Sequence, residues 1–285
     1  MQTILVATDF STRSDRAMRR ATLLAKQAGA KLFIVHVVDD DQSTPIVETE
    51  RLAAEKLLEE QAKTIHQVDG LFCATRVILA APFAGIAQAA VDAQADLLVI
   101  GPHRRQILRD AFAGTTAERS IRHASCPVLM VNATPVGAYR QALLTTDFSD
   151  CARAAAEAYY KLGIGADAKC GLLNVFEAPD LQHVLIHTLK EEERDRYLDK
   201  EAAKAQAELA EFRASLPFHS CQLLARFRGS TVANEVLNMA EQSAADLIVL
   251  GTQGRSGIKK LFLGSVAEEV LRYAQCDVLA VPNMA

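Results

Sequence analysis

Short apolar runs alternate along the chain with longer segments in which apolar residues recur every three or four positions. The runs predict buried strands and the segments predict amphipathic helices. In the first half, strands are expected at residues 3–9, 31–38, 71–79, 96–100 and 127–131, and helices at 15–28, 47–68, 83–93 and 115–124. Strands that alternate with helices are typical of an α/β fold, in which helices cover both faces of a parallel sheet.

The pattern then starts again, which indicates a tandem duplication. Residues 142–149 repeat residues 4–11 at an offset of 138, and residues 245–251 repeat residues 95–101 at an offset of 150. The second copy therefore carries about 12 extra residues (150 − 138), which we expect within 180–215.

That extra segment contains a long charged helix, expected at 191–212. A short linker is expected around 132–138, between domains at 1–135 and 139–285. Each domain should be an open five-stranded parallel sheet. Ligands of such sheets bind beyond the carboxyl ends of the strands, where the strand order reverses.

A glycine-rich segment, residues 251–265, carries the clearest chemical signal. It leaves a predicted strand, has the spacing G-x2-G-x9-G-S, and leads into a predicted helix. Glycines allow close backbone approach, and a helix N-terminus offers free N–H groups and a favourable dipole, so this arrangement suits a phosphate. The segment is neither a G-x-x-x-x-G-K-[ST] loop nor a G-x-G-x-x-G loop.

Composition narrows the class of protein. Half of the 285 residues are apolar, and the net charge is −4. The chain therefore lacks the excess of positive charge that is typical of nucleic-acid binding. No apolar run is long enough for a membrane span, and the first residues enter a strand pattern without a signal peptide. The six cysteines form no C-x-x-C pair, so we expect reduced thiols in a cytoplasmic protein.

Several motifs together resemble the universal stress protein family. They are a first strand ending in Thr-Asp-x-Ser, a second strand ending in His36-Val37, the strand Ala-Asp-Leu-Ile-Val-Leu-Gly, and the glycine spacing before the last helix. The resemblance covers nearly the whole chain twice and implies tandem Rossmann-like domains of the adenine-nucleotide α-hydrolase type. It also implies binding of ATP or another adenine nucleotide, with any Mg2+ carried mainly by phosphate oxygens.

Carried over to this sequence, the resemblance implies a nucleotide site in the second copy. The expected residues are Thr146 and Asp147 at the adenosine end, Val175 for backbone contacts to adenine, and Gly251, Gly254, Gly264, Ser265 and Val266 at the phosphates. The first copy departs from the pattern, with Arg104 in place of the second glycine and Pro102 without an N–H donor. Its degenerate site would comprise Asp9, Val37, Gly101, Arg104, Gly114 and Thr115.

Several of these residues also have simple structural explanations. Ser265 and Glu268 form a capping-box pattern with serine as N-cap, and Thr115 and Glu118 repeat it. Asp147 could simply start a turn. The side chains of Arg255, Lys259 and Lys260 could lie on a solvated surface or could approach a phosphate. His36 fits a hydrogen-bonded core position. His183 and His187 have the spacing of metal ligands on a helix, but no third ligand is evident. No metal site is expected.

Three functions remain in competition. The first is a cytoplasmic stress-response sensor or switch that binds an adenine nucleotide in its second domain, with at most slow hydrolysis. The second is a nucleotide-independent interaction or dimerisation module, and the third is an enzyme, either a weak ATPase or a nucleotidyl transferase. The fifth strands, 128–131 and 278–281, are expected at sheet edges. The family dimerises through this strand, so the two halves could pair as an intramolecular pseudo-dimer, and a homodimer could form as well.

Overall fold

A computed structural model describes residues 1–102, 114–178, 191–218, 220–254 and 263–283. The first repeat consists of β1 (Thr3–Ala7), α1 (Thr12–Ala28), β2 (Lys31–Val38), α2 (Thr44–Asp69), β3 (Cys73–Leu79), α3 (Pro82–Asp92), β4 (Leu97–Ile100), α4 (Thr116–His123) and β5 (Val128–Met130). The second consists of β6 (Gln141–Thr145), α5 (Asp150–Leu162), β7 (Lys169–Phe176), α7 (Glu191–Ala214), β8 (Gln222–Phe227), α8 (Val232–Gln242), β9 (Leu247–Gly251), α9 (Ser265–Tyr273) and β10 (Asp277–Val281). The predicted alternation of strands and helices is therefore confirmed.

Local signals explain where the helices begin and end. Helix α1 starts at Thr12, earlier than predicted, because the Ser11 side chain accepts a hydrogen bond from the N–H of Ser14 and caps the helix. It ends at Gly29, whose φ of 63° is the left-handed conformation that glycine adopts without strain. Helix α5 is capped in the same way by Ser149, so the duplicated turn carries its own start signal.

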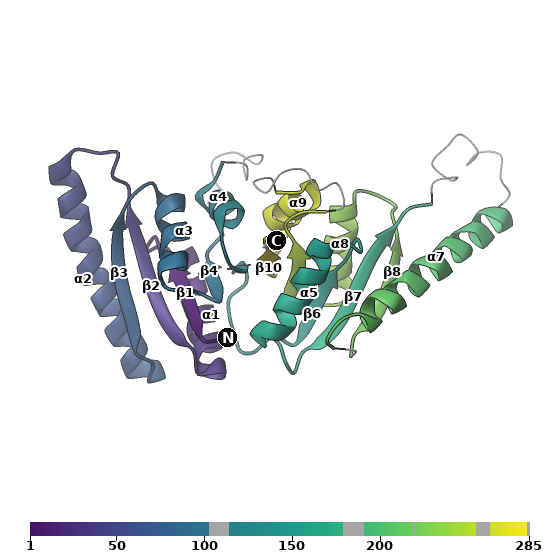
Figure 1. Ribbon diagram of the computed structural model, residues 1–285, viewed down its shortest axis with the longest axis horizontal. Helices are drawn as coiled ribbons and strands as arrows, with labels where there is room; N and C mark the ends of the chain where they lie inside the picture. Colours follow the sequence, from purple (N-terminus) through teal and green to yellow (C-terminus); the bar gives the residue numbers. More distant parts are fainter. Residues whose placement is uncertain (103–113, 179–190, 219, 255–262, 284–285) are drawn as a thin grey trace.

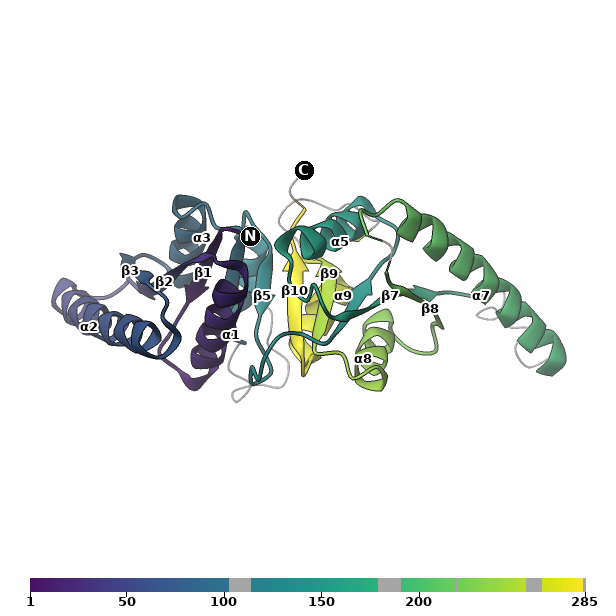
Figure 2. The same cartoon turned by 90° about the horizontal axis from the view of Figure 1, so that it is seen from below.

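The ten strands form one sheet in the order β3-β2-β1-β4-β5-β10-β9-β6-β7-β8. Within each repeat the neighbouring strands are parallel, whereas β5 and β10 pair antiparallel, with Leu129 opposite Leu279. Figure 2 shows this pair at the middle of the molecule, and Figure 1 shows α2 and α7 at its two ends. The predicted pseudo-dimer thus forms within one chain, and β5 and β10 are central strands, not edges.

Two apolar cores lie on the two faces of the sheet. Alternate residues of β1 illustrate the division: Ile4 and Val6 pack into one core, and Leu5 and Ala7 into the other. The first core is covered by α1, α2, α5 and α7, and the second by α3, α4, α8 and α9. Each core runs through both repeats, so burial of apolar surface holds the halves together. Among the described residues, no helix is long and apolar enough to cross a membrane.

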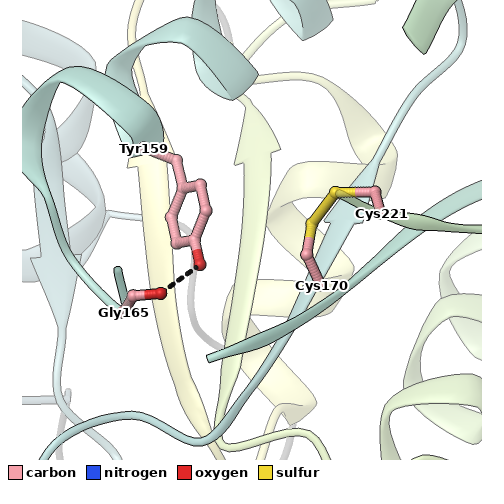
Figure 3. The surroundings of a disulfide bond; sticks show 4 residues. All are labelled: Tyr159, Gly165, Cys170 and Cys221. Atoms are coloured by element: carbon pink, nitrogen blue, oxygen red, sulfur yellow. Dashed lines mark hydrogen bonds between the residues drawn. A yellow bond between two sulfur atoms is a disulfide. The ribbon is translucent and has the colours of Figure 1, made fainter. Parts of the chain in front are cut away.

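A disulfide between Cys170 and Cys221 corrects the expectation that all cysteines are reduced (Figure 3). The local spacing of cysteines did not indicate this pairing, because the two residues are 51 positions apart in the sequence. The parallel register of β7 and β8 sets Gly171 opposite Gln222, so the preceding residues also face each other, with 4.6 Å between their Cα atoms. Cys73, Cys126, Cys151 and Cys276 are free.

Candidate functional site

A pocket of about 310 Å³ lies in the second repeat where the strand order reverses, between the carboxyl ends of β6 and β9. Strand β6 has β7 on one side and β9 on the other, so the connections leave a crevice above these ends. All eight residues expected at the nucleotide line this one pocket: Thr146, Asp147, Val175, Gly251, Gly254, Gly264, Ser265 and Val266. The structure therefore brings together residues that are up to 120 positions apart (266 − 146).

The turn after β6 fixes the position of Asp147. Its Oδ1 accepts a hydrogen bond from the N–H of Ser149 at 3.1 Å, and Thr146 Oγ1 accepts one from Phe148 at 2.9 Å. Phe148 has a φ of 66°, a left-handed conformation that is uncommon for a bulky residue. Asp147 thus does start a turn, and it lines the pocket as well, so the two interpretations of this residue are compatible.

Strand alternation explains how Val175 can offer its backbone to a ligand. The carbonyl of Leu173 accepts from Thr146 on the β6 side, and the carbonyl of Phe176 accepts from Arg228 on the β8 side. Successive residues of a strand direct their backbone groups to opposite sides, so the N–H and C=O of Val175 face the crevice beyond the end of β6. They present one donor and one acceptor next to each other.

Two glycines of the motif lie in close contacts. A Cβ on Gly251 would lie 2.9 Å from the carbonyl oxygen of Cys151, at the start of α5. A Cβ on Gly254 would lie 3.0 Å from Oδ2 of Asp147. Because residue 251 has no side chain, the loop after β9 can pass close to α5. Because residue 254 has none, the space beside the Asp147 carboxylate stays open.

The N-terminus of α9 faces the pocket and is not capped by a side chain. The N-cap is Gly264, without a side-chain hydrogen bond, and Ser265 is the first helical residue. The expectation that Ser265 is the N-cap is therefore wrong by one position. The N–H groups of Ser265, Val266 and Ala267 belong to the first turn, which has no carbonyl one turn earlier in the helix to bond. All three residues line the pocket.

Other backbone donors near this loop are already used. Thr252 donates its N–H to Val281 at 3.0 Å, and Gly264 donates to Thr252 at 2.8 Å. Pro102 occupies the position of Thr252 in the first repeat (252 − 150). Pro102 therefore removes no phosphate donor, because the equivalent N–H, that of Thr252, bonds within the sheet.

The first repeat has a matching pocket of about 430 Å³, lined by Asp9, Val37, Gly101 and Thr115 among others. Gly101 is needed for the same reason as Gly251: a Cβ there would lie 2.9 Å from the carbonyl oxygen of Arg13. Gly114 has a φ of 83° and precedes the helix without lining the pocket. Arg104, expected in this site, lies outside the described residues.

The N-terminus of α4 is capped by a side chain, unlike that of α9. Thr115 is the N-cap, and its hydroxyl accepts from the N–H of Glu118 at 3.2 Å. The Glu118 carboxylate, 1% exposed, accepts the N–H of Gly114 and pairs with Arg122. The predicted N-cap role of Thr115 is confirmed, whereas the Glu118 carboxylate bonds the N–H one residue before the N-cap. The corresponding N–H groups of the second repeat, those of Gly264 and Glu268, are bonded as well.

Sequence reasoning missed a contact that both repeats share. His36 Nδ1 lies 2.8 Å from the carbonyl oxygen of Thr8, and Asn174 Nδ2 donates to the carbonyl of Thr146 at 2.9 Å. The positions correspond (174 − 138 = 36). A carbonyl only accepts, so Nδ1 of His36 carries the proton. His36 is hydrogen-bonded as expected, yet it lines the pocket and is not enclosed in the core.

Five charged or metal-ligand candidates cannot be placed. Arg255, Lys259 and Lys260 of the glycine loop lie outside the described residues, as do His183 and His187.

Comparison with known proteins matches this architecture. The chain is 23% identical over 303 residues to Universal stress protein E of Escherichia coli, covering 98% of this chain and 93% of that protein. A 49-residue stretch is 53% identical to Universal stress protein MJ0531 of Methanocaldococcus jannaschii, covering 17% of this chain and 29% of the relative. The crystal structure of a universal stress protein from Archaeoglobus fulgidus superposes with a TM-score of 0.69 at 18% identity, covering 98% of each chain.

The profile of the Universal stress protein family matches residues 1–132 and again residues 138–282. Two matches in sequence agree with the two repeats of the sheet and with their mirrored strand order. The chain therefore belongs to the universal stress protein family and is of its tandem type.

Proposed function

We propose that the second repeat binds ATP or a related adenine nucleotide and that the protein acts as a sensor or switch in a cytoplasmic stress response. The observation that carries the proposal is the convergence of eight residues, from Thr146 to Val266, on one pocket. Its volume, about 310 Å³, is at the lower end of ligand pockets, which span roughly 300–1,000 Å³. The proposal keeps the domain boundaries 1–135 and 139–285.

Each part of the pocket suits one part of the nucleotide. The N–H and C=O of Val175 match the adjacent acceptor and donor on the edge of adenine. The Asp147 carboxylate can accept hydrogen bonds from ribose hydroxyls. The first turn of α9 offers N–H groups and the positive end of a helix dipole to the phosphates. A Mg2+ ion would enter with the nucleotide, held by phosphate oxygens.

Titration calorimetry of the full chain with ATP and Mg2+ tests the proposal, and the absence of heat at millimolar nucleotide would sink it. The Gly254→Arg variant copies the residue type of the first repeat. It should abolish binding, because a side chain at 254 starts 3.0 Å from Asp147 Oδ2 and fills the crevice. Phosphate release from the same samples separates a switch from a weak ATPase, which would turn ATP over well above the rate of the buffer alone.

A nucleotide-independent interaction module is the second candidate, and the replacement of the second motif glycine by Arg104 favours it for the first repeat. In that case partners captured by the full chain should be the same for the wild type and for Gly254→Arg. A homodimer would add a second copy to the intramolecular pair of β5 and β10. Sedimentation with and without ATP measures the formation of this homodimer.

The cytoplasmic location is part of the proposal. The Cys170–Cys221 disulfide weighs against this location, because disulfides are rare in a reducing cytosol.

A further inference from the structure

The disulfide occupies a place where the first repeat has a non-covalent contact. Cys170 corresponds to Leu32 (170 − 138 = 32), and Leu32 lies opposite Cys73 in the pairing of β2 with β3. Cys221 and Cys73 are therefore counterparts, and the second repeat differs by a cysteine in place of Leu32. Leu32 is 1% exposed and Cys73 is free, so the first repeat closes this place by packing alone. The fold of one repeat can thus form here without a covalent bond.

The bond is accessible from one side. Cys170 is partly exposed, whereas Cys221 is 8% exposed and packs into the core (Figure 3). Exchange with a thiol requires that the attacking thiolate reach one of the two sulfur atoms. The partial exposure of Cys170 gives a small thiol that route. A disulfide that does form in the cytosol of a mesophile is usually a redox-sensing or catalytic one.

Few other contacts hold the part of the chain that this bond closes. The bond spans 51 positions, which include α7. In the described sheet β8 is the last strand, with β7 as its neighbour, and none of its six residues is buried. Three of the 24 residues of α7 are buried: Ala205, Leu209 and Phe212. Units with few buried apolar contacts open locally at low cost in free energy, and a cross-link restricts the opened chain.

Helix α7 also borders the nucleotide pocket. A cavity of about 450 Å³ is lined by Glu201 of α7 and, among others, by Asp147 and Val175. Asp147 and Val175 line the nucleotide pocket as well. The ring of Phe148, next to Asp147, lies 5.8 Å from the ring of Phe212 on α7. Opening of α7 therefore removes support from the Asp147 turn and changes the charges beside the adenosine end of the site.

We propose that the Cys170–Cys221 bond is a redox switch: a small-molecule thiol reduces it in the folded protein, α7 then opens more readily, and the second repeat binds its nucleotide more weakly. The last step rests on the nucleotide site proposed above.

The exchange is balanced with two equivalents of the small thiol. A thiolate attacks Sγ of Cys170, the S–S bond breaks, and the sulfur of Cys221 leaves as a thiolate that takes up a proton. A second thiolate attacks the small-molecule sulfur of the mixed disulfide and releases Cys170, which is protonated in turn. The protein gains two electrons and two protons, and the two small thiols become one disulfide.

Hydrogen exchange of the folded full chain without nucleotide tests the opening of α7. After treatment with reduced glutathione, the amides of α7 and β8 should exchange roughly tenfold faster or more. Helix α2 and strand β3 are the internal control, because Cys73 is free and their exchange should not change. Oxidised glutathione should restore the slow rates. Unchanged exchange in α7, or a bond that reacts only in denatured protein, would overturn the proposal.

Two variants isolate the bond. Cys170→Leu copies Leu32 of the first repeat, so it should show the fast exchange of the reduced protein and no response to glutathione. Cys73→Ser, at the counterpart of Cys221, should respond as the wild type does. A Cys170→Leu variant that exchanges as slowly as the oxidised wild type would overturn the proposal, because α7 would then be held without the bond.

An ATP titration of both redox states tests the last step. The oxidised chain should bind ATP roughly fivefold more tightly, or better, than the reduced chain and Cys170→Leu. Equal affinities would overturn the proposed control of the nucleotide site. If neither state binds ATP but reduction still accelerates exchange in α7, the nucleotide site is refuted and the switch of α7 stands, so the two failures are told apart.

Discussion

Arg20 on α1 donates its Nε–H to Oδ2 of Asp277 on β10 at 3.1 Å, and this buried pair joins the first helix of the chain to its last strand. The Tyr139 hydroxyl donates to the same oxygen at 2.6 Å, and the N–H groups of Asn132 and Ala133 donate to Oδ1 at 3.0 Å. Asp277 is 0% exposed. One carboxylate of the second repeat therefore holds both ends of the linker and joins them to α1 of the first repeat, in addition to the shared cores.

Replacing this carboxylate should destabilise the whole chain. In Asp277→Asn the buried Arg20 loses its counter-charge, which costs about 3–5 kcal/mol when a buried pair is broken. Urea unfolding at pH 7 measures the change. The control is Asp246→Asn at the start of β9, where the carboxylate accepts from Arg140 and Gln141 but is 28% exposed. An equal decrease in the free energy of unfolding in the two variants would contradict the importance assigned to the buried pair.

The two helix N-termini should respond oppositely to loss of a hydroxyl. Thr115→Ala removes a cap that bonds Glu118, so it should cost about 1 kcal/mol of stability and leave ATP affinity unchanged. Ser265 makes no cap bond, so Ser265→Ala should change stability little and weaken ATP binding. Chemical unfolding and calorimetry on both variants check this crossed pattern. A stability loss confined to Ser265→Ala would show that the caps have been assigned to the wrong repeat.

Asp9 should titrate below its ordinary pKa of 3.8. Burial alone raises the pKa, but hydrogen bonds from Ser11 and Ser14 and the charge of Arg13 outweigh it and lower the pKa. The stability that Asp9 contributes is therefore present above pH 3.8 and is lost as the pH falls through the lowered value. Carboxyl-carbon NMR measures it. Ser11→Gly, which keeps most of the helix cap, should shift the pKa upward, and a wild-type value at or above 3.8 counts against these contacts.

Thiol counting tests the disulfide. Of six cysteines, four are free, so denatured protein kept from reductant should show four reactive thiols and reduced protein six. In the native state alkylation should be slow, because burial raises the pKa of Cys73 and Cys126 to about 11 and that of Cys276 to about 12. Six thiols without reductant would mean that Cys170 and Cys221 are not bonded in the isolated protein.

Much of the fold could be predicted because the same signals occur twice. The offset between Asp9 and Asp147 identified the duplication. The pairing of β5 with β10 was predicted because both strands were expected at sheet edges and the family dimerises through this strand. The disulfide could not be predicted, since it depends on the register of β7 against β8. The cap at Ser265 was misplaced by one residue, because a capping-box pattern does not say whether a preceding glycine takes the N-cap position.

The pocket in the first repeat shows a different limit. Its motif loses a glycine, which suggested a degraded site, whereas the structure keeps a cavity of about 430 Å³ there. Ser120 lies within a helix expected at 115–124, and no sequence pattern singled it out. Only the side chains around it show that its hydroxyl is buried in the wall of that cavity without a partner among the described residues.

Native mass spectrometry of the full chain with ATP and Mg2+ tests the central claim most directly, since it counts nucleotides per chain. The second repeat keeps Gly254 and has no side-chain cap on α9, whereas the first has Arg104 and a capped α4. This asymmetry predicts one ATP per wild-type chain and none on Gly254→Arg. Two ATP molecules per chain, or one that survives Gly254→Arg, would contradict the account.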